Sequence, residues 1–145
     1  MSFRGEIQAN HDALEQLFEA VVMALAGESS QLAVWLLDHD LDFSEIEPQF
    51  IGASSPFLES NSILAGSGLL IPLTAEKIKK IIPLFTENGH LGFEVLHLQI
   101  ESQGTLQFAA YDHFCPVFFG DQISIEMLET LKQNQVIQDY QRFDS

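Results

Sequence analysis

Residues 96–110 read LHLQIESQGTLQFAA and carry the clearest strand pattern in the chain. Apolar and polar side chains alternate on both sides of Ser102-Gln103-Gly104, a short segment that contains glycine. Alternation with a period of two is typical of a strand with one buried face, and a short Gly-containing turn joins two such strands. This stretch therefore predicts an antiparallel β-hairpin with one face in the core.

Helical patterns lie on both sides of this hairpin. Apolar residues recur at helical spacing from Leu14 to Leu25, with acidic residues on the opposite side. A second helix is predicted over residues 75–87 with Thr74 as its cap, and Pro83 should kink or split it. A third amphipathic helix is predicted after the cap Ser124.

Shorter apolar runs predict the remaining strands. They occur at residues 31–38, 69–73 and 117–119, and a further run at 45–51 contains Pro48, which favours an edge or a bulge. Hairpins mixed with helices, without regular βαβ alternation, indicate the α+β class. We therefore predict a mostly antiparallel sheet with helices packed on one face.

Length and composition favour one globular domain. The chain has 145 residues, a common size for a single domain, so we predict one domain over residues 1–145. Apolar residues make up 46% and include 12 Phe, which argues against intrinsic disorder. The residues predicted to form the core are Leu17, Phe18, Val21, Val34, Leu36, Leu98, Ile100, Leu106, Phe108 and Leu128.

Charge and cysteine content restrict the class of partner and the compartment. Asp and Glu outnumber Lys and Arg by 21 to 6, and the net charge of −15 argues against binding to nucleic acid or to an anionic membrane. Cys115 is the only cysteine, which fits a reducing compartment. Neither a signal peptide nor a membrane span is evident. We therefore expect a cytoplasmic protein.

Five of the 21 acidic residues crowd into one stretch at the end of the strand predicted at 31–38. This stretch resembles the start of a calcium-binding EF-hand loop, but Phe43 replaces the required Gly and Gln49 replaces the final Glu. No Lys or Arg lies among the acids, so the stretch is either a solvated loop or a surface that docks a basic protein. Its members are Asp38, Asp40, Asp42, Glu45 and Glu47.

No motif predicts a catalytic or cofactor site. The chain's His90, His97, His113 and Cys115 lack the close spacing of zinc ligands. A phosphate-binding loop and a nucleophile elbow are also missing from the sequence. We therefore predict a protein that is not an enzyme and has no metal or cofactor, with Cys115 as a small buried residue.

The segment that follows the hairpin has two interpretations. Residues 110–114 combine aromatic, acidic and imidazole groups. Tyr111 and Phe114 can fill the core while Asp112 caps a turn, or Tyr111 and Asp112 can anchor a protein interface. The segment could also border a ligand pocket together with residues 52–68, which are rich in Gly, Ser and Pro. A small enzyme or ligand-binding domain is therefore the alternative function.

The second half of the chain resembles small immunity proteins of bacterial toxin systems. The resemblance spans residues 69–140 and includes LLIPLT at 69–74, HLQI at 97–100 and LQFAAYDHF at 106–114. It implies a compact, acidic, cytosolic α+β protein that binds and blocks a cognate toxin domain without catalysis.

Charge and resemblance together lead us to expect a protein that binds a basic partner, an immunity protein that neutralises a secreted toxin. The predicted partner-binding residues are Asp38, Asp40, Asp42, Glu45, Glu47, Tyr111 and Asp112.

Overall fold

In the part of the chain that the structure describes, eight strands form one antiparallel sheet in the order β3-β4-β2-β5-β6-β7-β1-β8. The computed structural model describes residues 3–37, 42–57, 67–87 and 90–143. The strands are β1 (Gly5–Ala9), β2 (Ser30–Leu36), β3 (Gln49–Ile51), β4 (Ser67–Pro72), β5 (Val95–Ser102), β6 (Thr105–Ala110), β7 (Val117–Phe119) and β8 (Ile137–Arg142).

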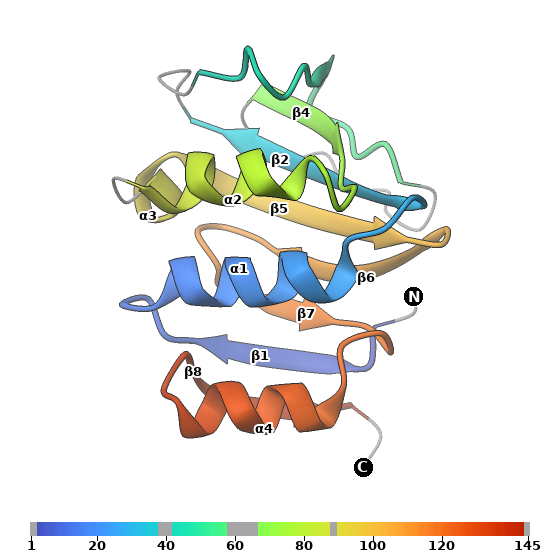
Figure 1. Cartoon of the computed structure of the whole chain (residues 1–145). Helices are drawn as coiled ribbons and strands as arrows, with labels where there is room; N and C mark the ends of the chain where they lie inside the picture. The colour runs from blue at the N-terminus through green and yellow to red at the C-terminus, as the bar shows by residue number, and fades with distance from the viewer. Residues whose placement is uncertain (1–2, 38–41, 58–66, 88–89, 144–145) are drawn as a thin grey trace.

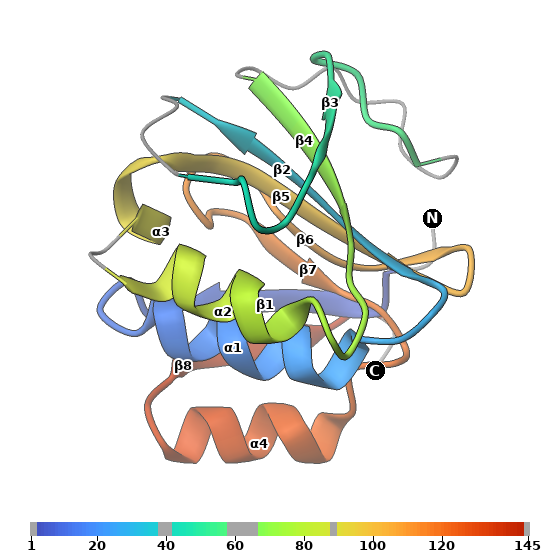
Figure 2. The same ribbon diagram turned by 45° about the horizontal axis from the view of Figure 1, so that its top comes forward.

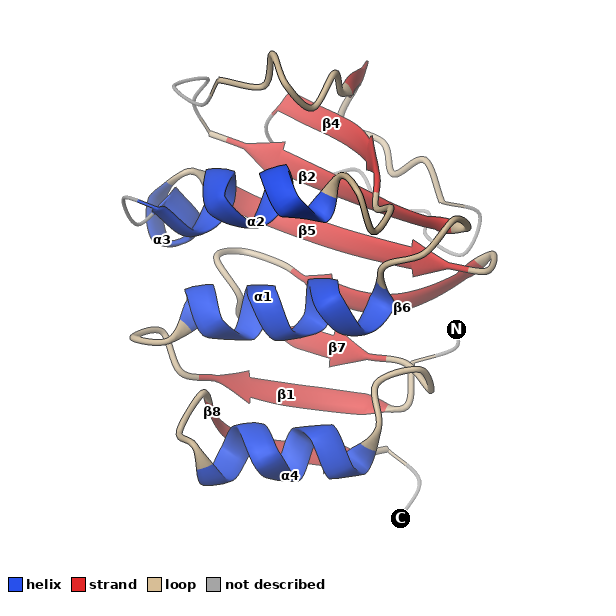
Figure 3. Cartoon of the chain, viewed as in Figure 1, coloured by secondary structure: helices blue, strands red, loops and turns tan. Residues whose placement is uncertain are grey.

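The helices lie on one face of this sheet. They are α1 (Leu14–Leu25), α2 (Ile78–Thr86), the short α3 (His90–Phe93) and α4 (Ile125–Gln133). In Figures 1 and 3, α1, α2 and α4 lie side by side in front of the strands. The turned view in Figure 2 agrees, and no helix of the described chain covers the opposite face. The predicted α+β class, with helices packed on one face of an antiparallel sheet, is thus confirmed. None of the described helices is long and apolar enough to cross a bilayer.

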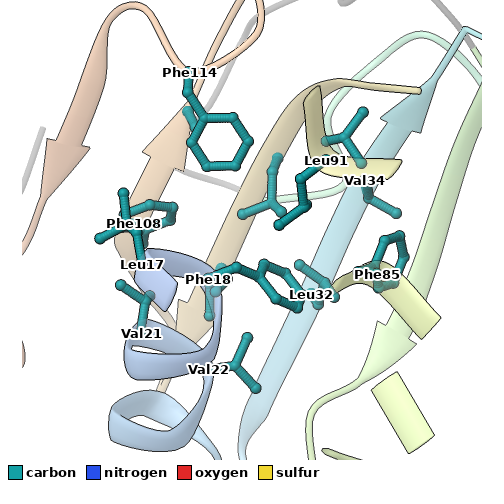
Figure 4. Packing of buried hydrophobic residues seen from close by; sticks show 14 of the residues in the cluster. Leu17, Phe18, Val21, Val22, Leu32, Val34, Phe85, Leu91, Phe108 and Phe114 are labelled. Atoms are coloured by element: carbon teal, nitrogen blue, oxygen red, sulfur yellow. The ribbon is translucent and has the colours of Figure 1, made fainter. Parts of the chain in front are cut away.

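The main core lies between the helices and the sheet. The apolar side of α1 places Leu17, Phe18 and Val21 against the strands, each at most 1% exposed. Figure 4 shows these side chains directed toward Phe108 and Leu32. Complete burial of one such side chain stabilises the fold by about 1.5–3 kcal/mol.

The hairpin at residues 96–110 is confirmed as β5 and β6, but the expectation of a single buried face is wrong. Gln99, Gln107 and His97 on these strands are also buried, at 0%, 1% and 6% exposure. A second apolar cluster forms on the face away from the helices, where Trp35 packs near Leu106 and is covered by part of segment 52–57. A hydrogen bond from Trp35 Nε1 to the Gly52 carbonyl oxygen (3.1 Å) ties that segment down.

Every predicted core residue is buried, although Leu106 belongs to the second cluster. The predicted cap Ser124 is confirmed, since its Oγ accepts from Met127 N–H at the start of α4. The predicted cap Thr74 is wrong: its Oγ1 accepts from Lys77 N–H, but residues 75–77 form a turn and α2 begins only at Ile78. A split of the second helix at Pro83 is wrong, because α2 continues to Thr86.

The two strands at one end of the sheet, β1 and β8, were not predicted from the sequence. The predicted strand at 45–51 is confirmed only for its last three residues, which form β3. Ile46 instead lies in a turn and is buried in the main core.

Candidate binding face

A row of aromatic rings crosses the sheet on the face away from the helices. Phe118 of β7 lies at its centre and contacts Phe3, Tyr111 and Phe143, with ring centroids 5.4, 6.2 and 6.2 Å away. The His97 ring lies 6.0 Å from Tyr111 and continues the row to β5. We call Phe3, His97, Tyr111, Phe118 and Phe143 the aromatic row. It joins segments from both ends of the chain.

The aromatic row is partly open to solvent and has carboxylates beside it. Phe143 is 56% exposed, and Phe118 is half-buried. In the sheet register Glu6 lies opposite Phe118 and Gln141, so its exposed carboxylate is on the same face. The Asp112 side chain, next to Tyr111, is 75% exposed. Exposed aromatic surface with a polar rim is typical of protein interfaces, and here the rim carries carboxylates.

Tyr111 is held in the row by a chain of hydrogen bonds. Its hydroxyl oxygen accepts from Gln99 Nε2 at 2.9 Å, and Gln99 Oε1 accepts from Ser55 Oγ at 2.6 Å. Burial raises the pKa of the Tyr111 phenol, so the hydroxyl is neutral at physiological pH. The ring is therefore presented in a fixed orientation, which reduces the entropy lost when a partner binds.

A left-handed turn follows Tyr111. Asp112, His113 and Phe114 have φ values of 50°, 62° and 66°. Each such non-glycine residue costs about 1–2 kcal/mol, so the surroundings must hold the turn in place. Leu96 O accepts from His113 N–H at 2.9 Å, and His97 Nδ1 accepts from Asp112 N–H at 3.1 Å.

The turn separates the two interpretations of residues 111–114. Phe114 is 2% exposed and belongs to the main core, whereas Asp112 is exposed and Tyr111 is half-buried on the other face. The expectation that Cys115 is buried is wrong, because the chain after the turn leaves its side chain exposed before the cis Cys115–Pro116 bond.

The predicted acidic stretch lies elsewhere. Asp38 and Asp40 fall outside the described residues, and Asp42, Glu45 and Glu47 are exposed. The Asp42 pKa is lowered by the hydrogen bond that its carboxylate accepts from Ser44 N–H. Ile46 between these acids packs in the core on the helix side, whereas Tyr111 packs on the opposite side. The two parts of the predicted interface therefore do not form one surface.

Lysines of the α2 region lie next to this acidic stretch. Lys77 Nζ donates to the Ile46 carbonyl oxygen at 2.7 Å. Lys79 and Lys80 line a hollow of about 240 Å³ together with Asp42 and Glu45. The chain's own lysines thus lie close to these acids, although none lies among them in the sequence, which weakens the argument for a basic partner at this position.

A shallow trough of about 470 Å³ lies beside the strand pair β1 and β8. Glu6, Gln8 and Gln141 line it together with His11 and Phe114. The alternative pocket was expected between segments 52–68 and 111–114. Only the second of these segments contributes to this trough, and residues 58–66 lie outside the described chain.

Phe3, Glu6, Phe118 and Phe143 were missed as candidate binding residues. A signal existed for Phe118, because alternation places it on the opposite face from Val117 and Phe119. Phe3 and Phe143 gave no signal, since each lies next to a strand that was not recognised.

In the described part of the chain, no three His, Cys, Asp or Glu side chains are grouped to hold a metal ion. Comparisons of the sequence and fold with protein-family profiles, curated proteins and solved structures find no match.

Proposed function

We propose that this chain is a non-catalytic protein-binding domain that engages a basic protein, as an immunity protein engages the bacterial toxin that it neutralises. The aromatic row with Glu6 and Asp112 beside it is the observation that supports this proposal most strongly. The resemblance of residues 69–140 to immunity proteins supplies the class of partner.

The side-chain composition of the row matches the requirements of a protein interface. Tyr and Phe bury large areas with little loss of side-chain entropy, and a few such residues supply most of the binding energy. In the row, Phe118 is the central anchor because three other rings contact it. The carboxylates of Glu6 and Asp112 would attract Arg and Lys at the rim.

The net charge of −15 supports a basic partner over a neutral one. A toxin that acts on nucleic acid needs a basic cleft, and an acidic protein is attracted to such a cleft at long range. Association would therefore be fast at low ionic strength and slower as salt is added.

Co-expression in a bacterial host tests this proposal. We expect the reading frame next to this chain to encode a toxic, basic domain, and that domain is the partner to use. We expect co-expression to restore growth and the purified proteins to form a complex by isothermal titration calorimetry. Persistent growth arrest, together with no binding at low salt, would refute the proposal.

Two charge-neutralising variants locate the contact. Glu6→Gln changes a carboxylate beside the aromatic row, whereas Glu19→Gln changes an exposed carboxylate on α1, on the helix side. Both remove one charge, so long-range attraction falls equally. We expect a lower association rate and a weaker salt dependence for both, with the larger loss of affinity for Glu6→Gln.

A further inference from the structure

We infer that His97 is a pH-sensitive latch that holds the left-handed turn at Asp112–Phe114 and thereby sets the shape of the binding face. The effect on binding rests on the proposed function. The latch itself is a property of the free chain and can be tested without a partner.

The protonation state of His97 follows from its partner. Asp112 N–H is a backbone donor and lies 3.1 Å from His97 Nδ1. Since a backbone N–H can only donate, Nδ1 accepts with its lone pair, and the neutral ring carries its proton on Nε2. A proton added to Nδ1 would remove this acceptor.

The same proton creates a second arrangement. Asp112 Oδ1 lies 3.9 Å from His97 Nδ1, which is beyond a hydrogen bond but within reach after a small movement. The protonated ring would donate from Nδ1 to this carboxylate and would no longer accept from the backbone of the same residue. The turn would therefore exchange one hydrogen bond for another and shift.

The surroundings of His97 determine the direction of its titration. Burial and the neighbouring His113 disfavour the charged ring, whereas the Asp112 carboxylate favours it, and the Tyr111 phenol is neutral. Burial is the largest influence and holds the pKa of His97 below its ordinary value of 6.5. His11 contacts the turn through its Nε2 and the His113 carbonyl oxygen, 2.9 Å apart, rather than contacting His97.

The sign of the pH dependence follows from this lowered pKa. In the unfolded chain the ring takes up a proton near pH 6.5, and in the folded chain only at lower pH. The stabilisation of the turn is therefore complete above about pH 6.5 and is lost as the pH falls through the lowered pKa.

The shift would alter the surface that a partner meets. Tyr111 and Asp112 are adjacent in the chain, and both belong to the face described above. Movement of the turn changes the position of the Asp112 carboxylate and the backbone support of the Tyr111 ring. Binding would thus be strongest at neutral pH and weaker in a mildly acidic solution.

Nuclear magnetic resonance of the free protein tests the latch. The imidazole nitrogen signals of His97 and the amide signals of residues 111–115 are recorded from about pH 7.5 to about pH 4.5. We expect Nδ1 to be unprotonated at neutral pH and the amides to change with the same midpoint as the ring. Hydrogen-exchange protection of Asp112 N–H should fall about five- to tenfold, as expected for one hydrogen bond.

Two variants provide the controls. His97→Asn keeps an acceptor near the position of Nδ1 but cannot be protonated, so the turn should hold its neutral-pH signals throughout. His11→Asn removes a different imidazole that contacts the turn and should leave the transition in place.

A constant turn while His97 titrates would overturn the inference, as would a proton on Nδ1 at neutral pH. The imidazole measurement on the unmodified chain decides the matter if His97→Asn does not fold. If the turn changes with the protonation of His97 but no protein partner binds the chain, only the proposed function is refuted. If a partner binds equally at all pH values, only the effect on binding is refuted.

Discussion

The Trp35 indole of β2 has room to lie against β4 because Gly68, the residue opposite it, has no side chain. A Cβ on Gly68 would lie 2.8 Å from Trp35 Nε1, 2.6 Å from Ile51 Cγ1 and 2.7 Å from the Gly52 carbonyl oxygen. Real Cβ atoms do not approach other atoms this closely, so any larger residue must move the indole or the segment that covers it. Position 68 thus determines whether segment 52–57 can close over the second cluster.

Gly68→Ala should therefore destabilise the protein by about 1–3 kcal/mol. Trp35 is the only tryptophan and is fully buried, so its fluorescence reports the site directly. We expect a lower midpoint in urea and a red-shifted emission in the folded state. Gly52→Ala is the matched control, because its added methyl group meets nothing within 4 Å. Equal stability of the two variants would contradict the prediction.

The Tyr111 hydroxyl has a separable role from the Tyr111 ring. Tyr111→Phe keeps the ring in the aromatic row but removes the acceptor for Gln99 Nε2, which lies in a fully buried side chain. We expect a loss of about 0.5–1.5 kcal/mol in the free energy of unfolding, measured with urea. Ser55→Ala removes the hydrogen bond that Ser55 Oγ donates to Gln99 Oε1 and should cost a similar amount. Unchanged stability in both variants would mean that the chain of hydrogen bonds does not hold Tyr111.

Among the secondary-structure elements, the two edge strands, β3 and β8, determine whether the sheet can pair with another molecule. The edge at β3 is short, with only three residues. At the other edge, Tyr140 N–H of β8 donates to Asp139 Oδ1 at 2.8 Å, and Lys132 Nζ of α4 lies 3.1 Å from the same oxygen. Short edge strands and charged side chains at an edge hinder pairing with another molecule.

Asp139→Ala should therefore increase self-association through β8. The change releases Tyr140 N–H, a donor that another strand can use. Sedimentation velocity over a range of protein concentrations measures the effect. Asp121→Ala removes an equal charge from an exposed ion pair with Arg4 and is the control. If both variants associate equally, charge alone is responsible and the edge is not protected by Asp139.

The sequence predicted those elements whose pattern depends only on neighbours along the chain. Strands β5 and β6 and helix α1 follow regular periods, and Ser124 forms a standard cap. In β8, by contrast, a register shift opposite Gln8 and Ala9 interrupts the alternation, so its pattern was not recognised. The aromatic row escaped prediction for a related reason, since tertiary pairing brings Phe3 and Phe143 to Phe118.

Across the whole molecule, the two faces differ in their suitability for a basic partner. The aromatic row lies on the face without helices, whereas Asp42 and Glu45 lie near lysines of α2 on the other side. The acidic stretch predicted from the sequence and the aromatic row are therefore competing sites, and one set of variants separates them.

Phe118→Ala should weaken binding of the basic toxin domain by about 30-fold or more, the effect expected when a central aromatic anchor is truncated. Asp42→Asn with Glu45→Gln should change affinity by less than about threefold, because nearby lysines already offset these charges. Titration calorimetry gives both values, and urea unfolding confirms that each variant is folded. The reverse order of effects would assign the interface to the acidic stretch.

The position of β1 in the sheet has a consequence for synthesis on the ribosome. Gly5 of β1 pairs with Phe119 of β7 and Arg142 of β8, both near the other end of the chain. At about 5–20 residues per second, β1 leaves the ribosome several seconds before either partner has been made. Strands β2, β5 and β6 can pair earlier, since all three precede β7 in the chain. Released chains that are truncated before β7 should therefore protect β5 from proteolysis while β1 is still cleaved.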